Sequence, residues 1–315
     1  MITHLHTPLD VARWLQASGA HALHGDSRQV RLGDAFVAWP GAAQDGRRYV
    51  AAALEVGAVA CVVEREGAEA FGFSDGRIAA VSDLKTHSGE IAHHFYREPS
   101  HKLKTVAITG TNGKTSTSWW TAQLLSGLGQ PCGTVGTLGM GVPGQAFQAT
   151  GLTTPDPVML QAGLSEFVHQ GLKACVLEAS SIGLEEGRLN GMRIQVAVFA
   201  NLTQDHLDYH GTMEAYWAAK RALFNWPGLR VAIVNIDDPH GATLAQELQS
   251  RVEDGSLDLW TLSVQGAPAR LHIPTSSLTD TGLRFEVVEN LPNGASGNAY
   301  SVKLPLVGEY NLYNL

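Results

Sequence analysis

Residues 107–120, A-I-T-G-T-N-G-K-T-S-T-S-W-W, have the composition of a loop that binds phosphate. An apolar run leads through Gly110 and Gly113 into Lys114 and Thr115. Backbone N–H groups at the start of a following helix would bind a phosphate, the lysine would neutralise it, and the threonine hydroxyl would help to hold Mg²⁺. The two glycines are closer together than in the common pattern G-x-x-x-x-G-K-[ST], and glycine also serves strand-to-helix turns for conformational reasons alone. The lysine and threonine nevertheless favour a nucleotide site.

Three other side chains have the chemistry of a metal–phosphate centre. Glu178 ends the apolar run A-C-V-L-E, where it is either the first solvated residue or a hard oxygen ligand for Mg²⁺. His206 and His210, in N-L-T-Q-D-H-L-D-Y-H-G, are loop histidines with no cysteine ligands beside them. They can take part only if the fold brings their segment to the phosphate loop.

Lys220 lies on the apolar side of a predicted helix. A helical repeat places it on the stripe of large side chains and places Arg221 on the other side; the stripe contains Met213, Tyr216, Trp217, Leu223 and Phe224. Lys220 is therefore either a lysine that snorkels at the edge of the stripe or a buried amine with a lowered pKa. A neutral amine can react with CO₂ to give a carbamate, which is a carboxylate able to bind a metal.

The elements that position these residues are short apolar runs without polar alternation. They cover residues 105–109, 174–178, 196–200 and 231–235, with a weaker run at 132–136. Such runs, separated by helix-like stretches, are typical of strands buried on both faces of a parallel sheet. Polar clusters follow four of them, and ligands bind at the carboxyl ends of parallel strands. We therefore expect the four clusters to form one crevice.

The pattern along the chain predicts an α/β protein. A small α/β domain covers residues 1–99, and the Pro- and Lys-containing segment 97–104 reads as a linker. A phosphate-loop-type domain with a mostly parallel sheet covers residues 100–307, and its part beyond residue 255 is expected to form a small, attached antiparallel sheet. Residues 308–315 are interpreted as the start of a further C-terminal domain that this chain lacks.

Composition excludes several classes of protein. The 315 residues, 44% hydrophobic and 17% charged, suit a soluble globular protein of two or three domains. A net charge of −8 argues against nucleic-acid binding. Cys61, Cys132 and Cys175 are far apart in the sequence and are expected to be buried free thiols in a reducing compartment. We find no signal peptide and no membrane span, and therefore expect a cytoplasmic protein without a membrane partner.

Several motifs together resemble those of the Mur ligases, the ATP-dependent enzymes that add amino acids in peptidoglycan synthesis. They are D-S-R (26–28), G-D-A-F-V-A (33–38), D-G-R-R-Y (45–49), G-T-N-G-K-T-S (110–116), T-T-P (153–155), E-A-S-S-x-G-L (178–184), N-L-T-Q-D-H-L-D-Y-H-G (201–211), N-I-D-D-P (235–239) and G-E-Y-N-L-Y-N (308–314). The short spacing of the phosphate loop is the form that this family uses. Two departures are Ile182, where the family often has His, and Glu186, where Gln is common.

The resemblance implies a role for each matching residue. The ATP-binding set is Gly110, Thr111, Asn112, Gly113, Lys114, Thr115 and Ser116, with Asn311 and Asn314 near the adenosine. The set for the UDP-muramoyl-dipeptide is Ser27 at the nucleotide, then Thr153, Thr154, Ser180, Glu186 and Arg188. The Mg²⁺ ligands are Thr115, Glu178, His206 and Lys220 as its carbamate. Lys114, Lys220 and His206 are the implied catalytic residues.

The implied reaction uses ATP and Mg²⁺ to join a diamino acid to UDP-MurNAc-L-Ala-D-Glu through an acyl phosphate. Meso-diaminopimelate is expected over L-lysine because it is the commoner substrate in the family, and the protein is expected to be a monomer. Without the family's third domain the chain is expected to be an inactive fragment. Two alternatives remain: a folylpolyglutamate synthetase-like ligase, which shares the G-T-N-G-K loop, and a nucleotide-binding module without catalysis.

Overall fold

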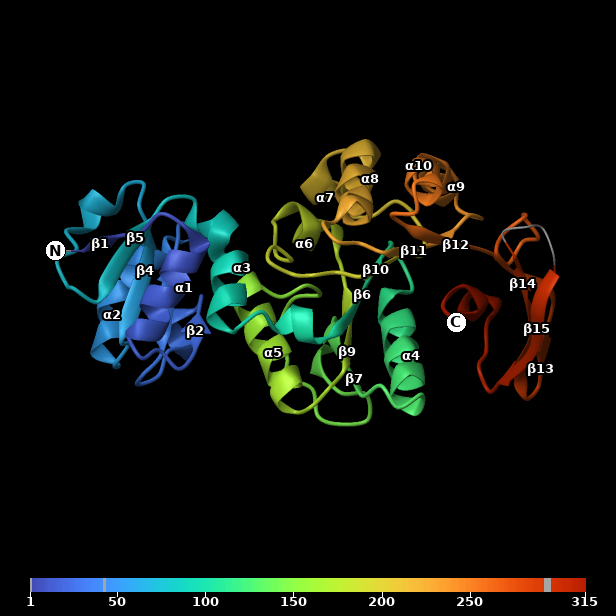
Figure 1. Cartoon of the computed structure of the whole chain (residues 1–315), viewed down its shortest axis with the longest axis horizontal. Helices are drawn as coiled ribbons and strands as arrows, with labels where there is room; N and C mark the ends of the chain where they lie inside the picture. The colour runs from blue at the N-terminus through green and yellow to red at the C-terminus, as the bar shows by residue number, and fades with distance from the viewer. Residues whose placement is uncertain (1, 42–43, 292–295) are drawn as a thin grey trace. The chain divides into compact units, whose positions relative to one another are not determined.

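The computed structural model describes residues 2–41, 44–291 and 296–315, which form two compact units (Figure 1). The first unit contains residues 1–103, 154–173 and 186–192, and the second contains residues 104–153, 174–185 and 193–315. The first unit therefore extends past residue 99 and includes two segments from later in the chain. The division into domains at residues 99 and 307 stays a prediction.

The first unit is built on a five-stranded parallel sheet in the order β1-β5-β4-β3-β2. Its strands are β1 (Thr3–His4), β2 (Leu23–His24), β3 (Ala35–Ala38), β4 (Ala60–Glu64) and β5 (Ile78–Val81). Its helices are α1 (Pro8–Ala17), α2 (Val50–Glu55), α3 (Leu84–Phe95) and α5 (Pro157–His169), with short 3₁₀ helices η1 (Ser27–Gln29), η2 (Gly46–Tyr49), η3 (Ala68–Phe71) and η4 (Pro99–Lys102).

Neighbouring residues of β3 and β4 enter two different cores. Val37 and Val62 pack with residues of α1 and α3, whereas Phe36 and Cys61 pack with residues of α2. Side chains alternate between the faces of a strand, so a strand covered on both faces must be apolar throughout. This explains why β3, β4 and β5 are almost continuous apolar runs.

The second unit contains a ten-stranded sheet in the order β15-β14-β13-β12-β11-β10-β6-β9-β7-β8. Its strands are β6 (Lys104–Thr109), β7 (Cys132–Gly136), β8 (Gly139–Gly141), β9 (Ala174–Glu178), β10 (Val196–Phe199), β11 (Val231–Asn235), β12 (Asp258–Ser263), β13 (Leu271–Thr279), β14 (Gly282–Asn290) and β15 (Ser296–Leu304). Its helices are α4 (Lys114–Gly127), α6 (Ser181–Glu185), α7 (Leu207–His210), α8 (Met213–Arg221), α9 (Pro239–Glu247) and α10 (Gln249–Glu253), with η5 (Ala222–Asn225) and η6 (Glu309–Tyr313).

The predicted apolar runs are strands of this sheet, and β11, β10, β6 and β9 are parallel neighbours. Strands β13, β14 and β15 are antiparallel, as expected for the end of the chain. They continue the parallel sheet through β12, where only Leu262 and Ser263 pair with β13. The predicted α/β class, with a parallel sheet and an attached antiparallel part, is confirmed.

The three cysteines are free and buried, as predicted. Burial raises the pKa of the Cys61 and Cys132 thiols to about 12, and it also raises the pKa of Cys175 well above its usual value. Among the helices of the described residues, none is long and apolar enough to cross a membrane.

Candidate nucleotide and metal site

The phosphate loop joins the carboxyl end of β6 to the start of α4. Gly110 has a φ of 148° and Gly113 a φ of 87°, conformations that L-residues rarely adopt. An added Cβ would lie 3.0 Å from the Cβ of Ala200 at Gly110, and at Gly113 it would lie 2.1 Å from Oδ1 of Asn314, whose side chain would have to move. Gly113 caps α4 without a side chain, so nothing of its own covers the start of the helix.

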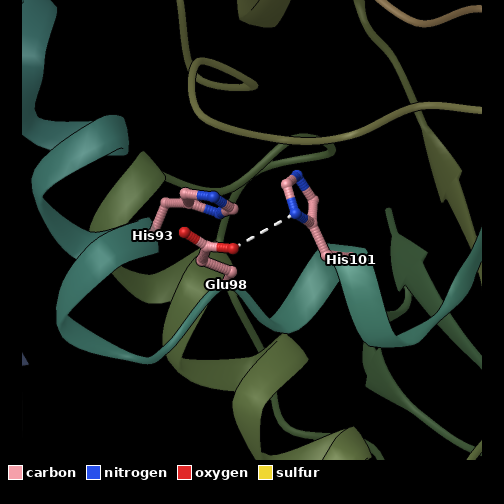
Figure 2. Close-up of side chains that lie close together, drawn as sticks. All are labelled: His93, Glu98 and His101. Carbon is pink, nitrogen blue, oxygen red and sulfur yellow. Dashed lines mark ion pairs between the residues drawn. The ribbon is translucent and has the colours of Figure 1, made fainter.

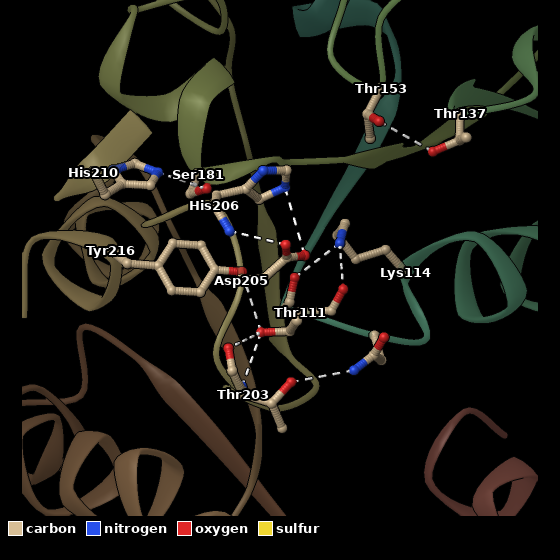
Figure 3. A network of polar contacts seen from close by, with 12 residues as sticks. Thr111, Lys114, Thr137, Thr153, Ser181, Thr203, Asp205, His206, His210 and Tyr216 are labelled. Atoms are coloured by element: carbon tan, nitrogen blue, oxygen red, sulfur yellow. Dashed lines mark hydrogen bonds and ion pairs between the residues drawn. The ribbon is translucent and has the colours of Figure 1, made fainter. Parts of the chain in front are cut away.

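Hydrogen bonds to the segment after β10 fix the shape of the loop. The hydroxyl of Thr111 accepts from the N–H of Thr203 at 2.9 Å and contacts the Tyr216 hydroxyl at 3.1 Å (Figure 3). The N–H of Asn112 donates to Oδ1 of Asn201 at 2.9 Å. The ends of two neighbouring strands are therefore joined, as the crevice prediction requires.

Lys220 is buried against this loop. Its side chain is 1% exposed, and Nζ donates to the carbonyl oxygen of Gly110 at 2.8 Å and lies 4.5 Å from the ring centre of Tyr216. Burial, with the positive charge of Lys114 as a second cause, lowers the pKa of Lys220 to about 7. No ion pair joins Lys220 to a carboxylate in the part of the chain that is described.

The stripe predicted around Lys220 is confirmed in part. Tyr216, Leu223 and Phe224 are buried with Lys220, although α8 ends at Arg221 and the last two lie in η5. Met213 and Trp217 are only half-buried, and Arg221 is exposed and pairs with Glu247. The snorkelling alternative for Lys220 is wrong, because its charged end does not reach solvent.

Lys114 lies over the same loop from the first turn of α4. Its Nζ donates to the carbonyl oxygens of Gly110 at 2.8 Å and Thr111 at 2.9 Å. Burial lowers its pKa as well. Two amines that prefer an anionic partner are thus held at one loop.

Glu178 and Thr115 have the donor chemistry of a magnesium site. The Glu178 side chain is 1% exposed, and Oε2 accepts from the Thr115 hydroxyl at 3.1 Å. The N–H and hydroxyl of Thr137 donate to the same carboxylate at 3.0 and 3.1 Å. Carboxylate and hydroxyl oxygens beside a phosphate loop are the ligands that Mg²⁺ takes, so these residues fit the ion.

The segment after β10 places His206 near Tyr216 and not against Glu178. His206 has a φ of 51°, its ring centre lies 6.2 Å from that of Tyr216, and its side chain is 46% exposed. Its ion pair is with Asp205, at 3.7 Å. His206 thus belongs to the side of the site that contains Lys220, since Tyr216 contacts both.

His210 is fully buried, unlike a loop histidine. Its Nε2 lies 3.0 Å from the Ser181 hydroxyl (Figure 3). Its Nδ1 lies 2.8 Å from Oε2 of Glu185. Both partners come from α6, which follows β9. His210 therefore joins α7 to α6, a contact that no sequence pattern indicated.

A cavity of 710 Å³ opens beside the phosphate loop within the second unit. Its lining residues are Asn112, Gly113, Ser116, Asn201, Thr203, Asn235, Asp237, Asp238, Pro239, Gln265, Tyr310, Tyr313 and Asn314. Three of the four predicted strand ends contribute to it, and the fourth, with Glu178 and Thr115, lines a separate small hollow. Asn314 lines the cavity, but the side chain of Asn311 donates to the carbonyl oxygen of Val307 and is not among the lining residues.

Two cavity residues, Gln265 and Asp237, have no site role predicted from the sequence. Gln265 follows β12 and donates to the Tyr313 hydroxyl at 3.0 Å, and both line the cavity. Asp237, from the motif N-I-D-D-P, accepts from the N–H groups of Val264 and Gln265. Only the aspartate could have been identified beforehand, from its position after a strand.

The residues expected to bind the muramoyl substrate are divided between the units. Ser27 begins η1, and Thr154, Glu186 and Arg188 also belong to the first unit. Arg188 donates to Oε2 of Glu186 at 2.9 Å and to the carbonyl oxygen of Thr154 at 2.9 Å.

Thr153 and Ser180 belong to the second unit. The hydroxyls of Thr153 and Thr137 lie 3.1 Å apart, and the Ser180 hydroxyl accepts from the N–H of Gly183 at 3.0 Å. Thr153 is therefore one contact away from Glu178.

Comparisons with known proteins agree on one family. Residues 108–315 match the family described as Mur ligase middle domain. UDP-N-acetylmuramoyl-L-alanyl-D-glutamate–2,6-diaminopimelate ligase from Acidovorax sp. (strain JS42) is 49% identical over 318 residues, which cover 99% of this chain and 61% of the relative. The chain thus spans about three fifths of the length of the curated relatives it matches.

Solved structures give the same result. A UDP-N-acetylmuramoyl-L-alanyl-D-glutamate–2,6-diaminopimelate ligase superposes with a TM-score of 0.76 and 34% identity, over 94% of this chain and 57% of that one. Folylpolyglutamate synthase of Mycobacterium tuberculosis, complexed with ADP and AMPPCP, has a TM-score of 0.56 and 17% identity, over 73% of this chain and 56% of that one. The second likeness is one of fold alone.

Proposed function

The chain belongs to the Mur ligase family, and from this we propose that it forms part of a MurE-type ligase, which adds 2,6-diaminopimelate to UDP-MurNAc-L-Ala-D-Glu with ATP. The observation that carries the proposal is the burial of Lys220 against Gly110 of the phosphate loop. A loop that only binds nucleotide does not need a second, buried amine. A ligase that stabilises a transferring phosphoryl group has a use for it.

ATP is proposed to bind with its phosphates at residues 110–116 and its adenosine in the cavity of 710 Å³. The exposed start of α4 and Lys114 provide N–H groups and positive charge for the phosphates. Asn314, next to Gly113 and in the cavity lining, is the better-supported of the two predicted adenosine residues.

Thr115 and Glu178, and His206 with the Lys220 carbamate, would hold Mg²⁺, which when bound would neutralise charge on the transferring phosphoryl group. The carbamate forms when the neutral Lys220 amine attacks CO₂, with release of one proton. The lowered pKa of Lys220 supplies that neutral amine near pH 7. The product is a carboxylate, which suits a buried position facing a cation better than an isolated ammonium does.

The substrate carboxylate of D-glutamate is proposed to attack the γ-phosphate, giving an acyl phosphate and ADP. The amine of the diamino acid then displaces phosphate and forms the amide. In this scheme Arg188 and Thr154 bind the muramoyl peptide in the first unit, Thr153 and Ser180 do so in the second, and Ser27 contacts the uridine diphosphate. The protein is proposed to act as a cytoplasmic monomer with no nucleic-acid partner.

The test is a ligation assay on the protein that also carries the remaining two fifths of the relatives' length, with a binding assay on residues 1–315. We expect amide formation with diaminopimelate, and binding of UDP-MurNAc-L-Ala-D-Glu by the 315-residue chain in preference to a folate. Preference for the folate would favour the folylpolyglutamate synthetase-like alternative. ATP binding that is indifferent to both substrates would favour the non-catalytic module.

A further inference from the structure

A cluster of two histidines and one glutamate lies in the first unit, at the end of α3. Ligand atoms of His93, Glu98 and His101 all lie within 4.8 Å of one another (Figure 2). Within the described parts of the chain, this is the one group of at least three His, Cys, Asp or Glu residues so arranged. None of the three belongs to the phosphate loop, its cavity or the muramoyl set.

The backbone holds the three side chains together. Helix α3 ends at Phe95, after which Arg97 and Glu98 both have left-handed φ values, 60° and 57°. The N–H of Glu98 donates to the carbonyl oxygen of His93 at 2.8 Å, and that of His101 to Glu98 at 3.1 Å. Two consecutive non-glycine residues in this conformation are costly, and such strain collects at functional positions. This turn places Glu98 and His101 beside the end of α3.

The side chains have separations that suit metal ligands. His101 Nδ1 lies 3.3 Å from Oε2 of Glu98, which is about the separation of two ligands on a tetrahedral ion with bonds of about 2.0–2.1 Å. The ring centres of His93 and His101 are 5.0 Å apart.

An ion pair between Glu98 and His101 does not account for His93. His93 is 6% exposed, and its Nδ1 is buried with no hydrogen bond of ordinary geometry; the buried side chain of Gln161 is only a weak hydrogen-bond partner. A buried imidazole nitrogen that is poorly satisfied is costly. Coordination to a cation held by the two exposed residues would reduce that cost.

We propose that His93, Glu98 and His101 form a site for a divalent transition-metal ion, Zn²⁺ in particular. Two imidazole nitrogens with one carboxylate favour Zn²⁺ over Mg²⁺ or Ca²⁺, which prefer oxygen ligands only. Three protein ligands leave a fourth position for water. The ion would join the end of α3 to η4, just before β6, and so brace the first unit. The site is independent of the proposed ligase function.

The experiment is calorimetric titration of residues 1–315 with ZnCl₂ in excess Mg²⁺, which occupies oxygen-rich sites. His101→Asn and Glu98→Gln change the two exposed ligands and leave the buried His93 in the core. His169→Asn, an exposed histidine of α5 in the same unit, is the matched control. Circular dichroism of each metal-free variant establishes that it is folded.

We expect one Zn²⁺ at this site in the unchanged chain and in the control. Each ligand variant should bind it at least about tenfold more weakly, since loss of even an outer partner of a metal ligand has an effect of that size. Co²⁺ should give the visible absorption of a tetrahedral complex in the unchanged chain and not in His101→Asn. Equal Zn²⁺ affinity in the ligand variants and the control, or no Zn²⁺ binding in excess Mg²⁺, overturns the proposal.

Discussion

Lys114 and Lys220, from two different helices, each donate a hydrogen bond of 2.8 Å to the same carbonyl oxygen of Gly110. One carbonyl cannot neutralise two ammonium groups, and burial lowers the pKa of both amines. The two amines therefore favour the binding of a negatively charged group at the loop. A nucleotide phosphate is such a group for Lys114, and conversion of Lys220 to a carbamate removes one of the two cations.

The first prediction concerns Lys220. In the full-length ligase, Lys220→Ala should lower the rate of ligation by about 10²–10³-fold, because stabilising charge is removed from the transferring phosphoryl group. A small added carboxylate, such as formate or acetate, should partly restore activity. Arg221→Ala, the neighbouring exposed residue, should leave the rate unchanged. Near-normal activity of Lys220→Ala would remove the carbamate role.

A second prediction tests the loop. Gly113→Ala places a Cβ 2.1 Å from Oδ1 of Asn314 at a φ of 87°, and the left-handed conformation alone costs about 1–2 kcal/mol for an L-residue. ATP affinity, measured by calorimetry, should fall at least about tenfold. Gly127→Ala at the end of the same helix has open space and should keep ATP affinity. Equal affinities in the two variants would show that the loop does not hold the phosphates.

The carboxylate at the end of β9 gives a third prediction. Glu178→Gln keeps the size of the side chain and removes its charge, so Mg²⁺-dependent ATP binding should weaken by about tenfold or more. ATP binding in EDTA should change little. Glu214→Gln, on the exposed side of α8, is the control. If the two variants respond to Mg²⁺ alike, Glu178 is not a ligand.

A fourth prediction follows from the departure at residue 186. Glu186 pairs with Arg188 at 2.9 Å, so it competes with an anionic substrate for the guanidinium. Glu186→Gln should lower the Kd for UDP-MurNAc-L-Ala-D-Glu by about twofold to fivefold, the range of a partly exposed ion pair. Arg188→Ala should raise it, and Glu166→Gln, exposed on α5, should not alter it. Weaker binding by Glu186→Gln would mean that the carboxylate itself contacts the substrate.

The fifth prediction is a pH dependence. Asp156 caps α5 by accepting from the N–H groups of Val158 and Met159 at 3.0 Å, and burial raises its pKa. The folded chain then binds this proton more readily than the unfolded chain, so the contribution of Asp156 to stability increases as pH falls toward the folded pKa. Asn is an equally good cap without a charge.

Asp156→Asn should therefore raise the free energy of unfolding most at pH 7, measured by urea denaturation. Its advantage should shrink as the pH falls from 7 toward the folded pKa of Asp156, which burial raises above its usual value. A difference that grows on acidification would show that ionised Asp156 is the stabilised form in the folded chain.

Local pattern was sufficient for the strands and for Lys220. An apolar run such as residues 174–178, short and separated from the next by a helix-like stretch, is typical of a strand with both faces covered. The burial of Lys220 with Tyr216 followed from the helical repeat of α8. The glycine and lysine residues of the phosphate loop could also be identified from the sequence.

Contacts between residues far apart in the chain could not be predicted from the sequence. Val158 lies in the core of the first unit with Leu23 and Ile91, and Gly89 closely approaches the backbone of Asn190. Nothing in the sequence of residues 154–173 or 186–192 indicates these partners. A division of the chain into consecutive domains therefore does not assign these two segments to the first unit. The place of Gln265 in the cavity was also not predicted, because it depends on a hydrogen bond to Tyr313, 48 residues further along the chain.

The buried thiols make the chain convenient for site-specific labelling. Alkylating reagents react with the thiolate, and burial keeps Cys61, Cys132 and Cys175 protonated and inaccessible at neutral pH. A single cysteine introduced at an exposed position, for example Leu128→Cys, can therefore carry a maleimide dye while all three native cysteines stay in place.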